Sequence, residues 1–187
     1  RVNDTFIAHY LRHAAALVKL FGSDGQFQRD LPLPGIGSVT GFRGRRTDTE
    51  TFFAFTSFTV PLTIHRLDLE TGRTEVFRAP KVGFNPDDYE TRQVFYASKD
   101  GTRVPLFISH RKGLPRDGRR PTYLYGYGGF NVSLTPSFSV PQLVWMEMGG
   151  VYAVANLRGG GEYGEEWHQA GIRLKKQNTF DDFIAAA

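Results

Sequence analysis

The sequence predicts the last part of a β-propeller over residues 1–81, followed by the first portion of a layered α/β domain over residues 82–187. Two hairpins in the first part have turn glycines at 25 and 72. This separation of 72 − 25 = 47 residues lies near the roughly 40–50 residues of a propeller blade. In the second part, expected strands alternate with expected helices, as is typical of an α/β sheet. The change of pattern places the domain boundary near Lys81.

Short strands separated by turns account for the first part. Residues 17–29 and 64–77 each read as a strand, a glycine-containing turn and a second strand. Residues 51–59 are rich in Thr and Phe and fit an inner strand of a blade. A β-sandwich gives similar strand spacing, so these residues alone leave both β architectures open.

Residues 9–18 (HYLRHAAALV) fit two different structures. Their alanines favour a helix, which would place His9 and His13 four residues apart on one face, as metal ligands are placed. The helical zinc motif also requires Glu directly after its first His, and Tyr10 occupies that position. We therefore predict two strands that meet near residue 13, and no metal site.

Strands and helices alternate in the second part. Residues 91–97 and 102–109 flank a Lys-Asp-Gly turn and predict a hairpin, and residues 122–125 predict the next strand. Residues 141–148 begin with Pro and are followed by two glycines, which predicts a helix. Residues 151–156 are almost all apolar, which indicates a strand buried on both faces.

The overall composition excludes several classes of protein. The 187 residues are 40% hydrophobic and 22% charged with a net charge of +4, as expected of a chain with a buried core. Because there is no cysteine, disulfides, thiolate metal sites and a cysteine nucleophile are excluded. The Arg-rich segments 43–46 and 116–120 lie among Gly, Asp and Pro and are expected to be solvated loops, so no nucleic-acid partner is predicted. No run of about 18 apolar residues occurs, so no membrane partner is predicted.

Residues 159–164 (GGGEYG) match the Gly-x-Gly-x-x-Gly pattern of dinucleotide-binding proteins. Asp181 and Asp182 follow about 20 residues later, where such proteins have an acid that binds ribose. Glu162 would, however, place a negative charge among the phosphates. No apolar strand follows the motif, and residues 179–182 resemble a capping box that starts a helix. We therefore disfavour a dinucleotide-dependent oxidoreductase and expect no cofactor.

Residues 123–131 (YLYGYGGFN) read as a strand that glycines interrupt sharply. In α/β-hydrolases, a Gly-rich loop after a buried strand supplies a donor to the oxyanion of the reaction intermediate. Glycines let backbone amides approach the developing charge, and a tyrosine hydroxyl can add a second donor. The simpler alternative is a Tyr-rich strand end beside an ordinary turn.

Three longer motifs extend this pattern: YGYGGFNVSLTPSFS at 125–139, VANLRGGGEYGEEWH at 154–168 and KQNTFDDF at 176–183. They resemble the catalytic domain of the prolyl oligopeptidase family, serine peptidases that cleave short peptides after proline. Residues 88–107 resemble the entry to that domain, and residues 55–72 resemble the last propeller blade. The resemblance covers nearly the whole chain. It implies an α/β-hydrolase domain preceded by the end of a seven-bladed propeller that admits only short peptides.

The resemblance implies roles for residues of the first motif. Tyr127 matches the tyrosine whose hydroxyl stabilises the oxyanion, and Phe130 matches one wall of the pocket that holds the substrate proline. Asn131 lies beside Phe130 at the substrate-binding position, with a structural rather than a chemical role expected. His168 is expected to pack or to form a hydrogen bond, because the family's triad histidine comes near the end of the domain.

None of the eight serines lies in a Gly-x-Ser-x-Gly elbow. The family places its Ser, Asp and His after the helix that begins near residue 180, so we expect all three beyond Ala187. The chain would then be a piece of a longer peptidase, inactive and poorly stable alone. The alternative is a catalytically inactive propeller–hydrolase scaffold that binds peptides or partners. The resemblance implies no metal or cofactor, short proline-containing peptides as partners, and a monomer in the cytoplasm or, as the alternative, the periplasm.

Overall fold

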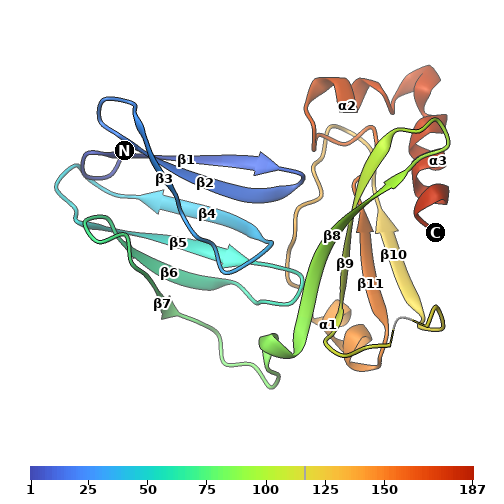
Figure 1. Cartoon of the computed structure of the whole chain (residues 1–187), viewed down its shortest axis with the longest axis horizontal. Helices are drawn as coiled ribbons and strands as arrows, with labels where there is room; N and C mark the ends of the chain where they lie inside the picture. The colour runs from blue at the N-terminus through green and yellow to red at the C-terminus, as the bar shows by residue number, and fades with distance from the viewer. Residues whose placement is uncertain (116) are drawn as a thin grey trace. The chain divides into compact units, whose positions relative to one another are not determined.

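The structure, a computed structural model, describes residues 1–115 and 117–187. Arg116, in one of the Arg-rich segments that the sequence predicts to be loops, lies outside the described residues. Within the described part of the chain, no helix is both long enough and apolar enough to cross a membrane. The described residues form two compact units, one built of strands alone and one of strands and helices (Figure 1).

The first unit comprises Arg1–Phe84 together with Pro136–Phe138. It contains two antiparallel sheets in which strands adjacent in sequence pair with each other. One sheet consists of β1 (Thr5–Arg12), β2 (Ala15–Gly22) and β3 (Phe27–Asp30), and the other of β4 (Ser38–Arg43), β5 (Glu50–Thr56), β6 (Thr63–Asp68) and β7 (Thr74–Arg78). A four-stranded antiparallel sheet of this kind is the repeating blade of a propeller.

The segment at residues 9–18 forms a hairpin, which confirms the prediction of two strands. His13 and Ala14 form the turn with φ of 52° and 63°, and positive φ at both central residues is the geometry that suits tight hairpins. His9 lies on β1 opposite Val18 of β2. Among the described residues, no group of three or more His, Cys, Asp or Glu side chains is arranged to hold a metal ion.

The two hairpins with turn glycines are also present, as β2–β3 and β6–β7. Gly25 and Gly72 have φ of 79° and 73°, a left-handed conformation that glycine adopts without steric conflict. As predicted, β5 is an inner strand. The core of this unit contains residues from both sheets: Val18, Leu31, Val39, Phe53, Phe55 and Leu67.

Pro136–Phe138 belongs to the first unit although it is distant from it in sequence. The hydroxyl of Ser38 donates to the carbonyl oxygen of Pro136 at 2.7 Å. The amide of Phe138 donates to Oγ1 of Thr56 at 3.3 Å. The ring of Phe138 also stacks on that of Phe84, with centroids 5.8 Å apart. The polypeptide therefore leaves the first unit after Phe84, returns at Pro136 and leaves again after Phe138.

The second unit comprises Asn85–Thr135 and Ser139–Ala187. Its sheet has the strand order β10-β11-β9-β8, with β10 and β11 parallel and the other pairs antiparallel. Its elements are β8 (Tyr89–Ala97), β9 (Arg103–Arg111), β10 (Thr122–Gly126), α1 (Val140–Glu147), β11 (Val151–Ala155), α2 (Glu165–Gln169) and α3 (Gln177–Ala186), with short 3-10 helices at Pro86–Asp88 and Arg173–Lys175. These elements confirm the expected hairpin, the two further strands and the helix that follows Ser139.

Helices cover both faces of this sheet. Alternate side chains of β11 point to opposite faces. The hydroxyl of Tyr152 accepts a hydrogen bond from Gln142 of α1 at 2.9 Å, whereas Ala153 belongs to a core cluster that packs against Phe183 of α3. The helices α1 and α3 therefore lie on opposite faces, which is the layered arrangement that the sequence predicts.

The start of α3 differs from the prediction. The sequence suggests a capping box at residues 179–182, but the helix begins at Gln177, and the residue before it, Lys176, makes no side-chain capping bond. Thr179 is 3% exposed and Asp182 is 0% exposed, and both side chains bond to the loop that follows β11. The capping prediction is wrong because these tertiary hydrogen bonds use the side chains that a capping box would need.

Candidate active site

Two Gly-rich loops meet at one edge of the sheet in the second unit. The parallel register pairs Gly126 at the end of β10 with Ala155 at the end of β11, so the two strands end level with each other. Residues 127–131, which we call the tyrosine loop, follow β10, and residues 157–164, which we call the glycine loop, follow β11. Ligands of open α/β sheets bind at the carboxyl ends of the strands. The two motifs that the sequence singles out therefore lie together at such an edge.

Glycine is required where the two loops touch. A Cβ on Gly128 would lie 2.4 Å from Cγ2 of Thr179 and 2.8 Å from Cβ of Leu157. A Cβ on Gly159 would lie 2.4 Å from the carbonyl oxygen of Gly128. Both glycines also have positive φ, 59° and 98°, which residues with a side chain adopt only with strain. These glycines therefore allow one backbone to pack on the other.

The glycine loop packs around a buried carboxyl group. Glu162 is 6% exposed, and its Oε1 accepts hydrogen bonds from the amide of Leu134 at 2.9 Å and from Nδ2 of Asn156 at 3.2 Å. A Cβ on Gly160 would lie 2.2 Å from its Oε2. Burial raises the pKa of the Glu162 carboxyl. An acidic group at this position opposes phosphate binding, and the segment after the loop forms α2 instead of a second strand.

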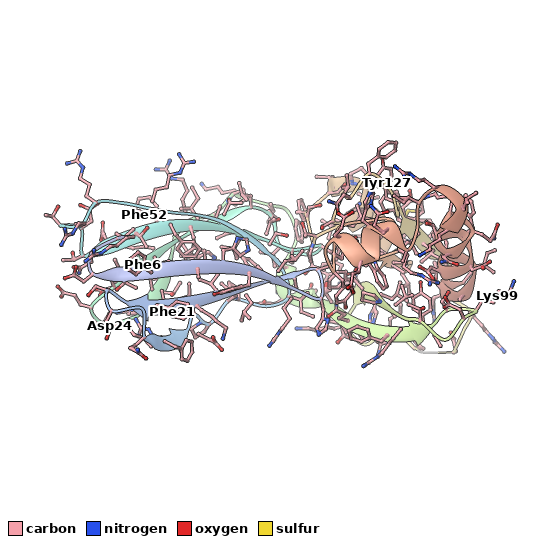
Figure 2. All side chains as sticks on the ribbon, turned by 90° about the horizontal axis from the view of Figure 1, so that it is seen from above. Phe6, Phe21, Asp24, Phe52, Lys99 and Tyr127 are labelled. Atoms are coloured by element: carbon pink, nitrogen blue, oxygen red, sulfur yellow. The ribbon has the colours of Figure 1, made fainter. Side chains whose placement is uncertain are left out.

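Tyr127 and Phe130 project from the tyrosine loop. Tyr127 is 44% exposed and Phe130 is 86% exposed, and their ring centroids lie 6.4 Å apart. Figure 2 places Tyr127 at the periphery of the second unit. Phe130 has a φ of 51°, and a left-handed conformation at a residue other than glycine costs about 1–3 kcal/mol. An exposed aromatic ring on a strained backbone indicates a residue that serves binding more than packing.

Asn131 connects the two loops through its backbone. Its amide donates to the carbonyl oxygen of Gly159 at 3.2 Å, and its φ is 57°. Nδ1 of His168 lies 2.8 Å from the same carbonyl oxygen, so Nδ1 is the nitrogen that carries the proton in this bond. His168 thus forms a hydrogen bond, as the sequence predicts. Asn131 and His168 together fix the carbonyl group of Gly159.

A buried ion-pair cluster is centred on Arg158 of the glycine loop, and no pattern in the sequence indicates it. Nη2 of Arg158 lies 2.6 Å from Oδ1 of Asp182, and Nη1 lies 2.6 Å from Oδ2 of Asp100. The backbone amide of Arg158 donates to Oδ2 of Asp182 at 3.0 Å. Hydrogen bonding to Arg158 holds the pKa of the Asp100 carboxyl well below its usual range. The cluster anchors the glycine loop to α3 and to the turn between β8 and β9.

Two more side chains from the start of α3 contact the loops. Nζ of Lys176 donates to the carbonyl oxygen of Gly128 at 2.6 Å and to Oγ1 of Thr179 at 3.3 Å. Oγ1 of Thr179 lies 2.7 Å from the carbonyl oxygen of Arg158 and 3.1 Å from that of Gly171. The sequence predicts no role at the site for Lys176, because its partners lie in other segments of the chain.

The four-stranded blade and the layered sheet define a part of a β-propeller joined to the start of an α/β-hydrolase domain. A model of the prolyl oligopeptidase N-terminal β-propeller domain matches residues 2–80, and the model of the prolyl oligopeptidase family matches residues 136–187. The chain belongs to the prolyl oligopeptidase family.

Several known proteins are similar to nearly the whole chain. It is 50% identical over 181 residues to the prolyl endopeptidase of Elizabethkingia meningoseptica, and the matched region covers 97% of this chain and 26% of that protein. It is 38% identical over 188 residues to the prolyl endopeptidase of Dictyostelium discoideum, covering 98% of this chain and 25% of that protein. The structure of apo prolyl oligopeptidase B from Galerina marginata matches with a TM-score of 0.89 at 40% identity, covering 98% of this chain and 27% of that chain. The chain thus spans about a quarter of the length of these relatives.

Proposed function

We propose that the chain is part of a serine peptidase that cleaves short peptides on the carboxyl side of proline. Residues 1–81 would be the end of its propeller and residues 82–187 the start of its catalytic domain. The observation that carries this proposal is the meeting of the tyrosine loop and the glycine loop at the carboxyl edge of β10 and β11. It is supported by 50% identity to a protein named prolyl endopeptidase.

Tyr127 would act as a donor to the oxyanion. In such a peptidase, a serine hydroxyl attacks the carbonyl carbon of the proline residue, a histidine accepts the serine proton, and an aspartate orients the histidine. The carbonyl oxygen gains negative charge, which the Tyr127 hydroxyl and a backbone amide would stabilise by hydrogen bonds. Since no serine of this chain lies in a Gly-x-Ser-x-Gly elbow, the nucleophile belongs to another segment of the polypeptide.

Phe130 would form one wall of the site for the substrate proline. Its ring is 86% exposed, so a proline ring can pack directly on its face and remove apolar surface from water. Such burial contributes about 25 cal/mol for each Å² of apolar surface. Asn131 would hold this wall in place, because the hydrogen bond from its backbone amide to the carbonyl oxygen of Gly159 fixes the backbone next to Phe130.

Hydrolysis of two matched chromogenic peptides tests the proposal. The full-length protein that contains this chain should hydrolyse succinyl-Gly-Pro-p-nitroanilide at least about tenfold more efficiently than the Gly-Ala analogue. A fluorophosphonate, which modifies an activated serine, should abolish the hydrolysis. Tight binding of the prolyl peptide without hydrolysis or labelling would instead support an inactive binding scaffold.

A further inference from the structure

We propose that Lys176 is a positioning residue of the oxyanion site. Its ammonium group would hold the Gly128 carbonyl, and thereby the backbone from which Tyr127 projects. The inference rests on the proposed function, because it takes Tyr127 as the donor to the oxyanion.

The contact between Lys176 and Gly128 is short and charge-assisted. Nζ lies 2.6 Å from the carbonyl oxygen of Gly128, and hydrogen bonds from a charged donor are roughly twice as strong as neutral ones. Gly128 directly follows Tyr127 and precedes a second glycine. Two consecutive glycines have more backbone freedom than any other pair of residues. A fixed carbonyl between them therefore removes much of the freedom of the tyrosine loop.

Thr179 provides a rigid support for this contact. It is 3% exposed, and its hydroxyl lies 3.3 Å from Nζ of Lys176 and 2.7 Å from the carbonyl oxygen of Arg158. Because a Cβ on Gly128 would lie only 2.4 Å from its Cγ2, the tyrosine loop lies directly on Thr179. The loop is thus held to α3 by packing as well as by a hydrogen bond.

Asp182 completes the same side of α3. Lys176 directly precedes α3 and has helical backbone angles (φ −60°, ψ −27°). Lys176, Thr179 and Asp182 are three residues apart, a spacing that places helical side chains on one face. Asp182 bonds to Arg158 of the glycine loop, whereas Lys176 bonds to the tyrosine loop. A single helical face therefore fixes both loops. Productive catalytic geometry must be held to within about 0.5 Å, and a cation, a hydroxyl and a carboxylate on one helix can provide this.

Replacement of Lys176 in the full-length peptidase tests the inference. Lys176→Met should lower kcat by about ten- to a hundredfold, the effect of misplacing a catalytic group by about 1 Å. KM should change less than about twofold, because the substrate ground state does not use the oxyanion donor. Lys176→Arg, which keeps a charged donor, should restore most of kcat. Lys175→Met is the matched control, since Lys175 is an exposed neighbour whose replacement should leave both constants unchanged.

A peptidyl prolinal provides a second readout. Its aldehyde forms a hemiacetal with the catalytic serine, so the affinity depends on the oxyanion donors. The inhibition constant should rise in Lys176→Met by the same factor by which kcat/KM falls, whereas affinity for the peptide acid product should not change. A loss of both affinities to the same extent would indicate general damage and overturn the positioning role.

A double-mutant cycle with Tyr127→Phe identifies the residue through which Lys176 acts. In the Tyr127→Phe background, Lys176→Met should lower kcat by less than about twofold, because the donor that it positions is already absent. Fully additive effects would overturn the inference. If Lys176→Met does not fold, Lys176→Gln replaces it in the same double-mutant cycle. If the wild-type protein cleaves prolyl substrates and Lys176→Met leaves kcat unchanged, the positioning role is overturned and the proposed function stands. If the wild-type protein does not hydrolyse prolyl substrates, the proposed function is overturned as well.

Discussion

Arg158 and Asp182 are joined by four hydrogen bonds of 2.6–3.1 Å, three from the guanidinium group and one from the backbone amide of Arg158. One residue lies in the glycine loop and the other in α3. The Asp182 carboxylate is 0% exposed and the Arg158 side chain is 6% exposed, so both charges are shielded from solvent and stabilise each other. This pair fixes the position of α3 relative to the glycine loop.

Asp182→Ala should lower the free energy of unfolding by about 3–5 kcal/mol, because the buried Arg158 charge loses its fully buried carboxylate and keeps the half-exposed Asp100 as its counter-ion. Urea denaturation of the full-length protein, followed by tryptophan fluorescence, measures the change. Asp181→Ala is the matched control: Asp181 accepts one exposed hydrogen bond from Gln177, and its loss should cost less than about 1 kcal/mol. Equal losses in the two variants would show that the buried pair adds nothing to stability.

Glu162→Gln should stabilise the protein at neutral pH. Burial raises the pKa of Glu162 above its usual value of 4.5, so the folded state binds the proton more tightly than the unfolded state does. The contribution of Glu162 to the free energy of unfolding is therefore fully present below the usual pKa of 4.5, and it is lost as the pH rises through the pKa of the folded state. Glutamine keeps the acceptor for Leu134 and Asn156 without the charge.

The expected gain in Glu162→Gln is on the order of 1 kcal/mol at about pH 8, and it should vanish near pH 4. Thermal unfolding midpoints of the wild-type and variant proteins between about pH 4 and pH 8 measure it. Glu165→Gln, at an exposed position in α2, is the matched control for the substitution itself. A stabilisation that is equal at all pH values would contradict the role of the buried carboxyl.

Tyr127→Phe should lower kcat by about 10²–10³-fold, as loss of one oxyanion donor does elsewhere. KM should stay within about twofold, because the hydroxyl acts mainly in the transition state. Steady-state hydrolysis of a prolyl p-nitroanilide measures both constants. Tyr123→Phe, at the other end of the same motif, is the matched control and should retain activity. Unchanged kcat in Tyr127→Phe would reduce Tyr127 to a residue at the end of a strand.

Phe130→Ala should reduce the preference for proline over alanine by about tenfold or more, because the proline ring loses an apolar contact. The measurement is kcat/KM for matched prolyl and alanyl substrates. The backbone strain at φ 51° remains in this variant, so stability should change little. Phe77→Ala is the control: it removes an exposed ring on β7 of the first unit, far from Phe130 in the sequence. It should leave the preference for proline over alanine unchanged. A similar loss in both variants would contradict the assignment of Phe130.

Local patterns predict most of the secondary structure. The hairpins are predictable because Gly25 and Gly72 carry the left-handed turn conformation, and β11 is predictable from its apolar run. The tyrosine loop is also recognisable, since glycines that interrupt a Tyr-rich strand form an uncommon pattern. Where the local signal and the tertiary bonds disagree, as at the start of α3, the tertiary bonds determine the structure.

The contacts that fix the two loops could not be predicted in this way. Arg158 and Asp182 lie 24 residues apart, and Lys176 lies 48 residues from Gly128. No periodicity connects positions at such separations, and a threonine followed by acids before an apolar stretch has the same pattern whether or not it caps a helix. Glu162 is a further example: its charge argues against phosphate binding, but the sequence does not reveal that its side chain is buried within the glycine loop.

The return of Pro136–Phe138 to the first unit means that three peptide crossings, not one, join the two units. After a proteolytic nick near residue 84, Pro136–Phe138 would still have its hydrogen bonds to Ser38 and Thr56. An expression boundary placed there would remove the partners of Phe138, which are Thr56 and Phe84. Cutting this protein into two separate halves at a single linker is therefore the wrong way to divide it.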